Sequence, residues 1–407
     1  MNRVRQAIAA TVLAVAAAAG LALLAGCPPA QQQTGATVPP PEDLAARPMG
    51  EPYKIGALFA VTGPASSLGE PERDTAMMLE QQVNEAGGIH GRPIQVIVRD
   101  TRGEETEALT AAVELIERES VLAIIGPSRS GTTLAVIDRV EQAGVPLISC
   151  AAARAITDPV KRWVFQVAPG DRDAVFRIYS YVHEQGITRV AALTESGGFG
   201  VEGLKQLEAQ AAEHGIEVVA KEEYGDTDPD MTAQLTRIAA TDAQAVVCWG
   251  VGKAPALIAK NMAQLGMDIP LFQSHGVANK RFIEAAGDAA NGVVMPAARL
   301  IVLDQLPADD PQLPVLRQYH EMFTARYGRE PDHYGGHAWD ALHIVVEAIR
   351  RAGPDADRSA VRDQIEQTEG FIGIGGIFAY SPEDHYGLSP EAFVMVRIED
   401  GEWKLLE

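Results

Sequence analysis

The sequence is poor in cysteine and in basic residues. Three cysteines among 407 residues are too few for a disulfide-built scaffold or a multi-cysteine zinc module. Lysine and arginine together number 34, against 55 aspartates and glutamates, which gives a net charge of −21. Nucleic-acid binding needs basic stripes that neutralise phosphates, so this balance predicts no nucleic-acid partner.

The common signatures of catalysis and cofactor binding are also missing. Residues 126–133 lack the Gly-Lys-Ser/Thr ending of a P-loop, and the glycines at 197, 198, 200 and 203 lack dinucleotide-site spacing. No Gly-x-Ser-x-Gly occurs. His333 and His337 stand four residues apart, but without the glutamate of His-Glu-x-x-His. We therefore expect that the protein binds no metal and no cofactor and is not an enzyme. An α/β dehydrogenase is the weakest of the alternatives.

One long apolar run is present, at the N-terminus. Arg3 and Arg5 precede the apolar residues 7–24, which lead into Leu-Ala-Gly-Cys ending at Cys27. A positive start, an apolar stretch and small residues before a cleavage point are typical of a secretory signal. The run is long enough to span a bilayer, so its length does not exclude a retained anchor. The ending resembles the bacterial lipobox, which implies a signal peptide at 1–26, acylation of Cys27 and a periplasmic or cell-envelope lipoprotein anchored to a membrane.

The segment that follows is rich in proline and glutamine. Residues 27–52 cannot build a core and favour extended conformations, so we expect a lipidated tether and a folded body from about Tyr53. An exported compartment permits a disulfide between Cys150 and Cys248. Free, partly buried thiols are favoured, because the two cysteines are expected in different lobes.

The body of the chain alternates strand with helix. Short apolar strands separated by helices of about a dozen residues predict βαβ units and a parallel sheet. The pattern restarts after residues 163–167, which predicts two doubly wound blocks. The expected strands are 54–61, 94–98, 121–125, 146–149, 163–167, 190–193, 218–219, 245–249, 271–273, 377–380 and 393–398. The expected helices are 71–86, 104–119, 132–143, 173–185, 203–214, 231–240, 254–265, 314–327 and 334–351.

Ligands of such sheets sit beyond the carboxyl ends of the strands. The loops that matter are therefore 62–70, 126–132, 150–154, 194–200, 249–253 and 274–279. The second of these opens a helix, whose unsatisfied N–H groups suit a carboxylate, and Ser130 and Thr132 add hydroxyls. The same residues suit simple N-capping, so the loop alone leaves ligand binding open.

Together these features resemble the extracytoplasmic solute-binding proteins of the type I periplasmic fold, in the leucine/isoleucine/valine-binding branch. The likeness is carried by residues 55–64 (IGALFAVTGP), 83–93 (VNEAGGIHGRP), 124–133 (IIGPSRSGTT) and 274–279 (SHGVAN), and covers about 53–400. It implies an α/β fold of two doubly wound Rossmann-like lobes joined by three crossover strands near 168–170, 296–298 and 379–381. The N-terminal lobe would comprise 53–169 and 298–378, and the C-terminal lobe 170–297 and 379–407, closing as a hinged trap.

The resemblance also implies a polar end of the binding site. Ser130 matches the serine that holds a ligand carboxylate, and Ser128, Arg129 and Thr132 share its loop. Ala151 matches a position of backbone contact. Ala153 stands where amino-acid binders keep a threonine or serine, so one polar contact is lost.

The rest of the expected wall is apolar. Phe199 and Leu68 stand at positions where relatives have tyrosine. Tyr334 falls near an aromatic position of the side-chain pocket, and Trp249 lies at a strand end that contributes an aromatic residue. These residues favour an apolar, planar ligand body.

His275 is the main departure from the family pattern. Amino-acid binders have an acid there, which pairs with the ligand ammonium, and a buried ammonium without a counter-charge is unfavourable by several kcal/mol. The sequence therefore favours an aromatic or branched aliphatic carboxylate over an amino acid. Glu70, Glu195 or Glu202 could restore the pairing, so an amino acid stays open.

The expected protein is a monomeric, lipid-anchored receptor that passes a small solute to the permease of an ABC importer. A sensor of the same fold with a signalling partner is the alternative that the sequence does not separate from it.

Overall fold

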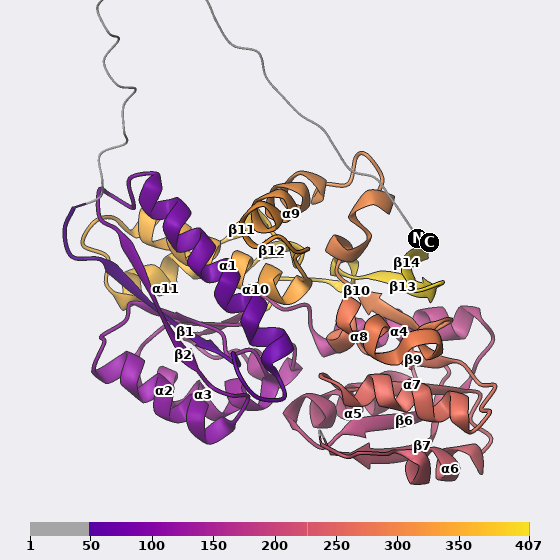
Figure 1. Ribbon diagram of the computed structural model, residues 1–407. Coiled ribbons are helices and arrows are strands. Elements are labelled where there is room, and N and C mark those ends of the chain that lie inside the picture. The colour runs from indigo at the N-terminus through magenta and orange to yellow at the C-terminus, as the bar shows by residue number, and fades with distance from the viewer. Residues whose placement is uncertain (1–48, 226, 407) are drawn as a thin grey trace, which may run out of the picture. The chain divides into compact units, whose positions relative to one another are not determined.

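Two β-sheets organise the chain (Figure 1). The computed structural model describes residues 49–225 and 227–406. The first sheet has the order β2-β1-β3-β4-β5, and all its neighbours are parallel. Its strands are β1 (Tyr53–Phe59), β2 (Ile94–Asp100), β3 (Ala123–Ile125), β4 (Leu147–Ser149) and β5 (Val164–Gln166). Helices α1 (Ser66–Glu85), α2 (Glu105–Glu117) and α3 (Ser130–Ala143) connect them.

The second sheet has the order β14-β13-β10-β9-β8-β6-β7. Its parallel strands are β6 (Arg189–Glu195), β7 (Glu217–Tyr224), β8 (Ala245–Trp249), β9 (Leu271–Gln273) and β10 (Val294–Ala297). Strands β13 (Val394–Glu399) and β14 (Glu402–Leu406) extend it antiparallel. Helices α4 (Asp171–Glu184), α5 (Gly198–Ala211), α6 (Thr232–Ala239), α7 (Ala254–Gln264) and α8 (Lys280–Ala286) accompany this sheet. The predicted two-lobe α/β fold with parallel sheets is confirmed.

The chain passes three times between the sheets. It leaves the first sheet after β5 and returns after β10 to form α9 (Leu313–Tyr327), α10 (His333–Ala352), α11 (Arg358–Glu366) and the hairpin β11 (Glu369–Ile372) and β12 (Ile377–Ala379). Helices α9, α10 and α11 share one buried cluster with the first sheet. The last passage leads from β12 to β13. No strand is described at residues 167–170 of the first passage, where Pro169 lacks an N–H for a ladder.

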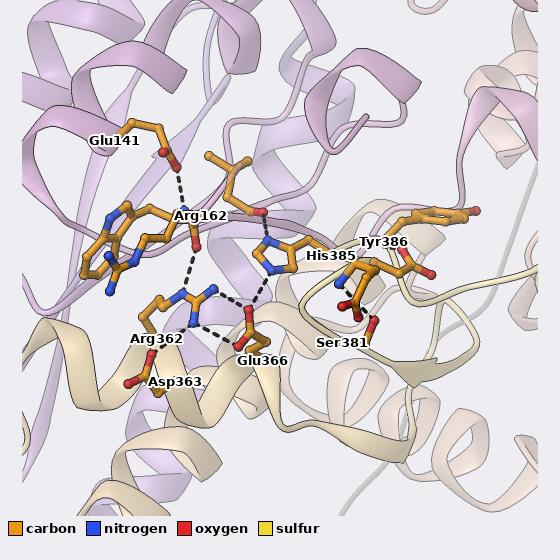
Figure 2. Close-up of polar contacts among 12 residues, drawn as sticks. Glu141, Arg162, Arg362, Asp363, Glu366, Ser381, His385 and Tyr386 are labelled. Carbon is orange, nitrogen blue, oxygen red and sulfur yellow. Dashed lines mark hydrogen bonds and ion pairs between the residues drawn. The ribbon is translucent and has the colours of Figure 1, made fainter. Parts of the chain in front are cut away.

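The first and last passages lie side by side. Gln166 N donates to His385 O at 3.1 Å, and Gly170 N donates to Tyr386 Oη at 2.7 Å. Figure 2 shows Arg362 of α11 and His385 directed at the Glu366 carboxylate, with His385 Nε2 at 3.1 Å. The ring of His385 also stacks on Phe165 of β5, with centroids 4.1 Å apart. These contacts tie the last passage to the edge of the first lobe.

Several element boundaries differ from the sequence predictions. Helix α1 begins at Ser66 rather than at residue 71, because Pro71 lies inside the helix and does not start it. Helix α5 begins at Gly198 rather than 203, since its glycines are helical and not turn residues. Elements α8, α11, β11 and β14 were not predicted, and β10 was expected only as a crossover strand near residues 296–298.

The two cysteines of the body, Cys150 and Cys248, are free and buried, as favoured. The expected signal peptide, Cys27 and the tether up to residue 48 lie outside the described residues. Across the part of the chain that is described, no helix combines the length and apolarity that a membrane crossing needs.

Candidate functional site

A cavity lies where the loops leaving both sheets meet. Each of the six loops singled out in the sequence contributes to its wall, as expected for the carboxyl ends of parallel strands. The cavity measures about 30 Å³, which is room for about two water molecules. Its wall consists of Leu68, Ser128, Arg129, Ser130, Cys150, Ala151, Ala152, Ala168, Phe199, Val251, His275, Gly276, His333, Tyr334 and His337.

Most of the residues predicted for the site stand on this wall. Ser128, Arg129, Ser130 and Ala151 come from the ends of the first-sheet strands, and Leu68 comes from the first turn of α1. Across from them, Phe199 and His275 belong to the second sheet's side of the cavity. Tyr334 lies in the first turn of α10.

Three predicted residues do not line the cavity. The Thr132 hydroxyl donates to Arg129 O at 2.9 Å, so its hydrogen bond is made within the turn that starts α3. Ala153 is fully buried in the hydrophobic cluster behind the loop. Trp249 lies behind the wall, with its ring centroid 5.8 Å from that of Phe199 and 5.9 Å from that of His275. It supports these two rings and is excluded from the cavity by them.

The glycine at 203 makes room for this indole. A Cβ on Gly203 would lie 2.3 Å from the Trp249 ring. Glycine is therefore required there by close packing, which explains the glycine-rich start of α5 without any dinucleotide site.

The polar end of the cavity is built around the start of α3. Ser130 is the first residue of that helix and is buried, and the first N–H groups of a helix have no partner within the helix itself. Beside it, Ser128 Oγ accepts from Ala60 N at 3.0 Å and donates to the Glu72 carboxylate. Burial raises the pKa of Glu72 well above its usual value, more than the Ser128 hydrogen bond lowers it.

Arg129 links this end to the other lobe. Its Nη2 lies 3.2 Å from Glu195 Oε1 at the end of β6. Glu195 is fully buried, and its second oxygen accepts from Val251 N at 2.9 Å. The pair places one positive and one negative group at the seam between the lobes.

The wall opposite α3 carries three buried histidines. His333 and His337 lie on α10, and His275 lies on the second lobe. Burial lowers the pKa of His275 to about 3 and that of His333 to about 4. Burial lowers the pKa of His337 well below its usual value too, helped by His333 and His275. All three imidazoles are therefore neutral at pH 7. From the sequence, His333 and His337 stood out only as possible metal ligands, although Tyr334 beside them was expected in the pocket.

Asp171 is a buried acid next to the cavity wall, although it does not itself line the cavity, and the sequence did not single it out. It is fully buried as the first residue of α4, and neither carboxylate oxygen has a hydrogen-bond partner within the described residues. Its Oδ1 lies 3.9 Å from His275 Nε2. Burial raises its pKa well above the usual value, and Glu202 and Glu195 raise it further. Glu70 is one of the acids that could have paired with a ligand ammonium, but it forms an ion pair with Arg281 at 3.1 Å instead.

The lobes touch around the cavity. Tyr334 Oη donates to Gly276 O of the second lobe. At the starts of α3 and α5, a Cβ on Gly198 would lie 2.8 Å from Gly131 Cα, so the two backbones are in direct contact. Together with the rim pair of Arg281 and Glu70, these contacts enclose the cavity from both lobes.

A model of the periplasmic binding protein family matches residues 52–402. The chain is 24% identical over 314 residues to the leucine-, isoleucine-, valine-, threonine-, and alanine-binding protein of Pseudomonas aeruginosa, covering 77% of this chain and 81% of that protein. It resembles the crystal structure of an extracellular ligand-binding receptor from Rhodopseudomonas palustris, with a TM-score of 0.83, 28% identity and coverage of 88% and 100% of the two chains. A leucine binding protein from Thermotoga maritima gives a TM-score of 0.78 at 24% identity, covering 87% and 97%.

Proposed function

Because the chain belongs to the periplasmic binding protein family, whose members are solute receptors and not enzymes, we propose that it binds an amino-acid-like solute between its lobes. It would deliver this solute to the permease of an ABC importer. The observation that carries the proposal is the cavity itself, whose wall comes from both lobes at the carboxyl ends of both sheets. A solute held there contacts both lobes at once and so favours their closed arrangement.

The cavity must widen to take up such a solute. Its volume of about 30 Å³ is far below the roughly 300 Å³ at the lower end of small-molecule sites. Uptake therefore requires the lobes to separate, or Phe199 and Tyr334 to turn away from the centre. The hydrogen bond from Tyr334 to Gly276 O is one contact that opening would break.

The polar groups support a ligand with a carboxylate at one end and an ammonium at the other. The start of α3 at Ser130 and the Arg129 guanidinium suit the carboxylate. Asp171 is not on the cavity wall, but its unpartnered carboxylate lies 3.9 Å from Nε2 of His275, which is on that wall. Burial raises the pKa of Asp171, and an adjacent ammonium would lower it, so the ligand itself would restore the counter-charge that its ammonium needs. The argument from His275 against an amino acid therefore loses its basis, and the amino-acid-like class is preferred over a carboxylate without an amine.

Calorimetry with two matched pairs tests this class. The pairs are leucine with 4-methylpentanoate and asparagine with succinamate, in which only the amine differs. We expect the better-bound amino acid to bind more tightly than its deaminated partner. Asp171→Asn should weaken binding of the amino acid by about ten- to a hundredfold, because a charge-assisted contact is lost. The same substitution should change the affinity for the deaminated acid by no more than about threefold. Tighter binding of the deaminated acids would instead restore the class inferred from His275 alone.

We also propose that acylated Cys27 anchors the mature receptor to a membrane. The support is the lipobox-like Leu-Ala-Gly-Cys after an apolar run. Intact mass spectrometry of the mature N-terminus tests this, and an unmodified N-terminus elsewhere would refute it.

A further inference from the structure

Two buried imidazoles present hydrogen-bond acceptors to the cavity. The Nδ1 atoms of His333 and His337 on α10, like that of His275 on the second lobe, are buried and have no hydrogen-bond partner in the described part of the chain. Both side chains are about 95% buried, with 5% of their surface exposed, and both line the cavity. Buried polar atoms of native proteins are nearly always hydrogen-bonded, so two such atoms on one cavity wall call for a bound partner.

The surroundings of the two rings determine which chemistry they offer. At each ring a backbone interaction, with Ala278 for His333 and with Cys150 for His337, counteracts the lowering of the pKa by burial, as a hydrogen bond donated to a carbonyl does. Because Nδ1 has no partner in either ring, the donor in each case is Nε2. The neutral rings are therefore Nε2–H tautomers, and each Nδ1 carries a lone pair that can only accept.

The other charged groups near α10 favour a neutral donor over a cation. The Asp332 carboxylate accepts from Gly335 N at 3.1 Å as the cap of α10. Asp340 accepts from Ile374 N and Gly375 N, both at 2.7 Å. The Glu72 carboxylate accepts a hydrogen bond from Ser128, and burial favours the protonated form of Glu72. A cationic ligand side chain buried here would lack a carboxylate to pair with, and burying an unpaired charge is energetically unfavourable.

We propose that the solute's side chain carries neutral N–H donors, as in a carboxamide or ureido group, which bond to His333 Nδ1 and His337 Nδ1. This inference rests on the proposed function, since it assigns the side-chain end of the same amino-acid-like ligand. The carboxylate lies at Ser130 and the ammonium toward Asp171, so the side chain extends along α10. His333 and His337 thereby determine specificity, and they set this receptor apart from binders of aliphatic side chains.

Asparagine and leucine provide a near-isosteric test, because their side chains differ mainly in carboxamide against isopropyl. Calorimetry with the purified full-length protein in detergent should show asparagine, glutamine or citrulline binding at least tenfold tighter than leucine. His337→Leu should reduce that preference by about ten- to a hundredfold, because the ligand N–H is left unpaired. His337→Gln, which keeps an acceptor, should retain most of it.

His343→Leu is the matched control. His343 lies on the same helix, and its Nδ1 is within 2.8 Å of Trp339 O, away from the cavity. This variant should keep the wild-type preference. The inference would be overturned if the wild type bound leucine more tightly than asparagine, glutamine and citrulline, whether or not the variants fold. An unchanged preference in His337→Leu would overturn it as well. If no amino acid or deaminated acid binds, the proposed function fails and the inference fails with it.

Discussion

The buried imidazoles make the site sensitive to acid. His275 is packed among Phe199, Trp249 and Phe393, and its Nε2 lies 3.9 Å from Asp171 Oδ1. With little solvent to stabilise an imidazolium, the folded protein holds this ring neutral. The unfolded chain takes up the proton readily near its ordinary pKa of about 6.5.

The free energy of unfolding should therefore fall as the pH falls. The folded pKa of His275, about 3, is below the unfolded value, so between these two values the unfolded state binds more protons. Each such histidine then removes about 1.4 kcal/mol of stability per pH unit. From pH 7 to pH 5, His275→Gln should lose about 2 kcal/mol less than the wild type in urea titrations. An equal loss in both proteins would show that His275 is not held neutral by burial.

The contrast between His275 and Asp171 shows how far sequence reasoning reaches. Strand ends and the family resemblance placed His275, Ser130 and Phe199 at the cavity, because topology determines which loops meet. Asp171 was missed because an aspartate at the start of a helix is the usual partner of a helix N-terminus. Only the three-dimensional structure shows that its carboxylate is buried, unpartnered and close to His275.

At the scale of elements, two helix starts form one of the contacts between the lobes. Helices α3 and α5 both begin at the carboxyl ends of strands, and Gly131 and Gly198 let their backbones touch. Glycine is needed here because of the close approach and not because of its backbone angles.

Gly198→Ala should oppose closure without weakening the fold. The added Cβ would lie 2.8 Å from Gly131 Cα and 2.9 Å from Gly131 N, and backbone atoms cannot easily move aside. The clash should destabilise the closed arrangement by about 1–3 kcal/mol, which weakens solute affinity about five- to a hundredfold. Alanine is favoured over glycine in a helix, so the thermal midpoint without solute should not fall. Unchanged affinity would mean that the bound form does not bring these helix starts together.

The elements that the sequence did not predict are those with mixed signals. Strand β10 was expected only as a crossover strand, because it contains Pro296, which argues against a central strand. Its register with β9 covers Val294 alone, and Pro296 is paired with Met395 of the antiparallel strand β13. Helix α8 is only seven residues long, too short for its periodicity to be distinctive.

At the scale of the whole molecule, three chain passages allow one lobe to move against the other. The last passage is tied to the first lobe by Arg362, Glu366 and His385 (Figure 2). The contacts that opening must break lie at the cavity, at Tyr334–Gly276, Arg129–Glu195 and Arg281–Glu70. We therefore expect the three passages to act as the hinge and the two lobes to separate at the cavity.

Solution scattering with and without solute tests the central claim most directly, which is that a solute bound between the lobes favours their closure. The measurement uses the solute that calorimetry shows to bind best, at a concentration that saturates the site. The account predicts a smaller radius of gyration with the solute than without it, and a smaller change in Gly198→Ala. Superimposable curves from the free and the saturated wild-type protein would contradict it.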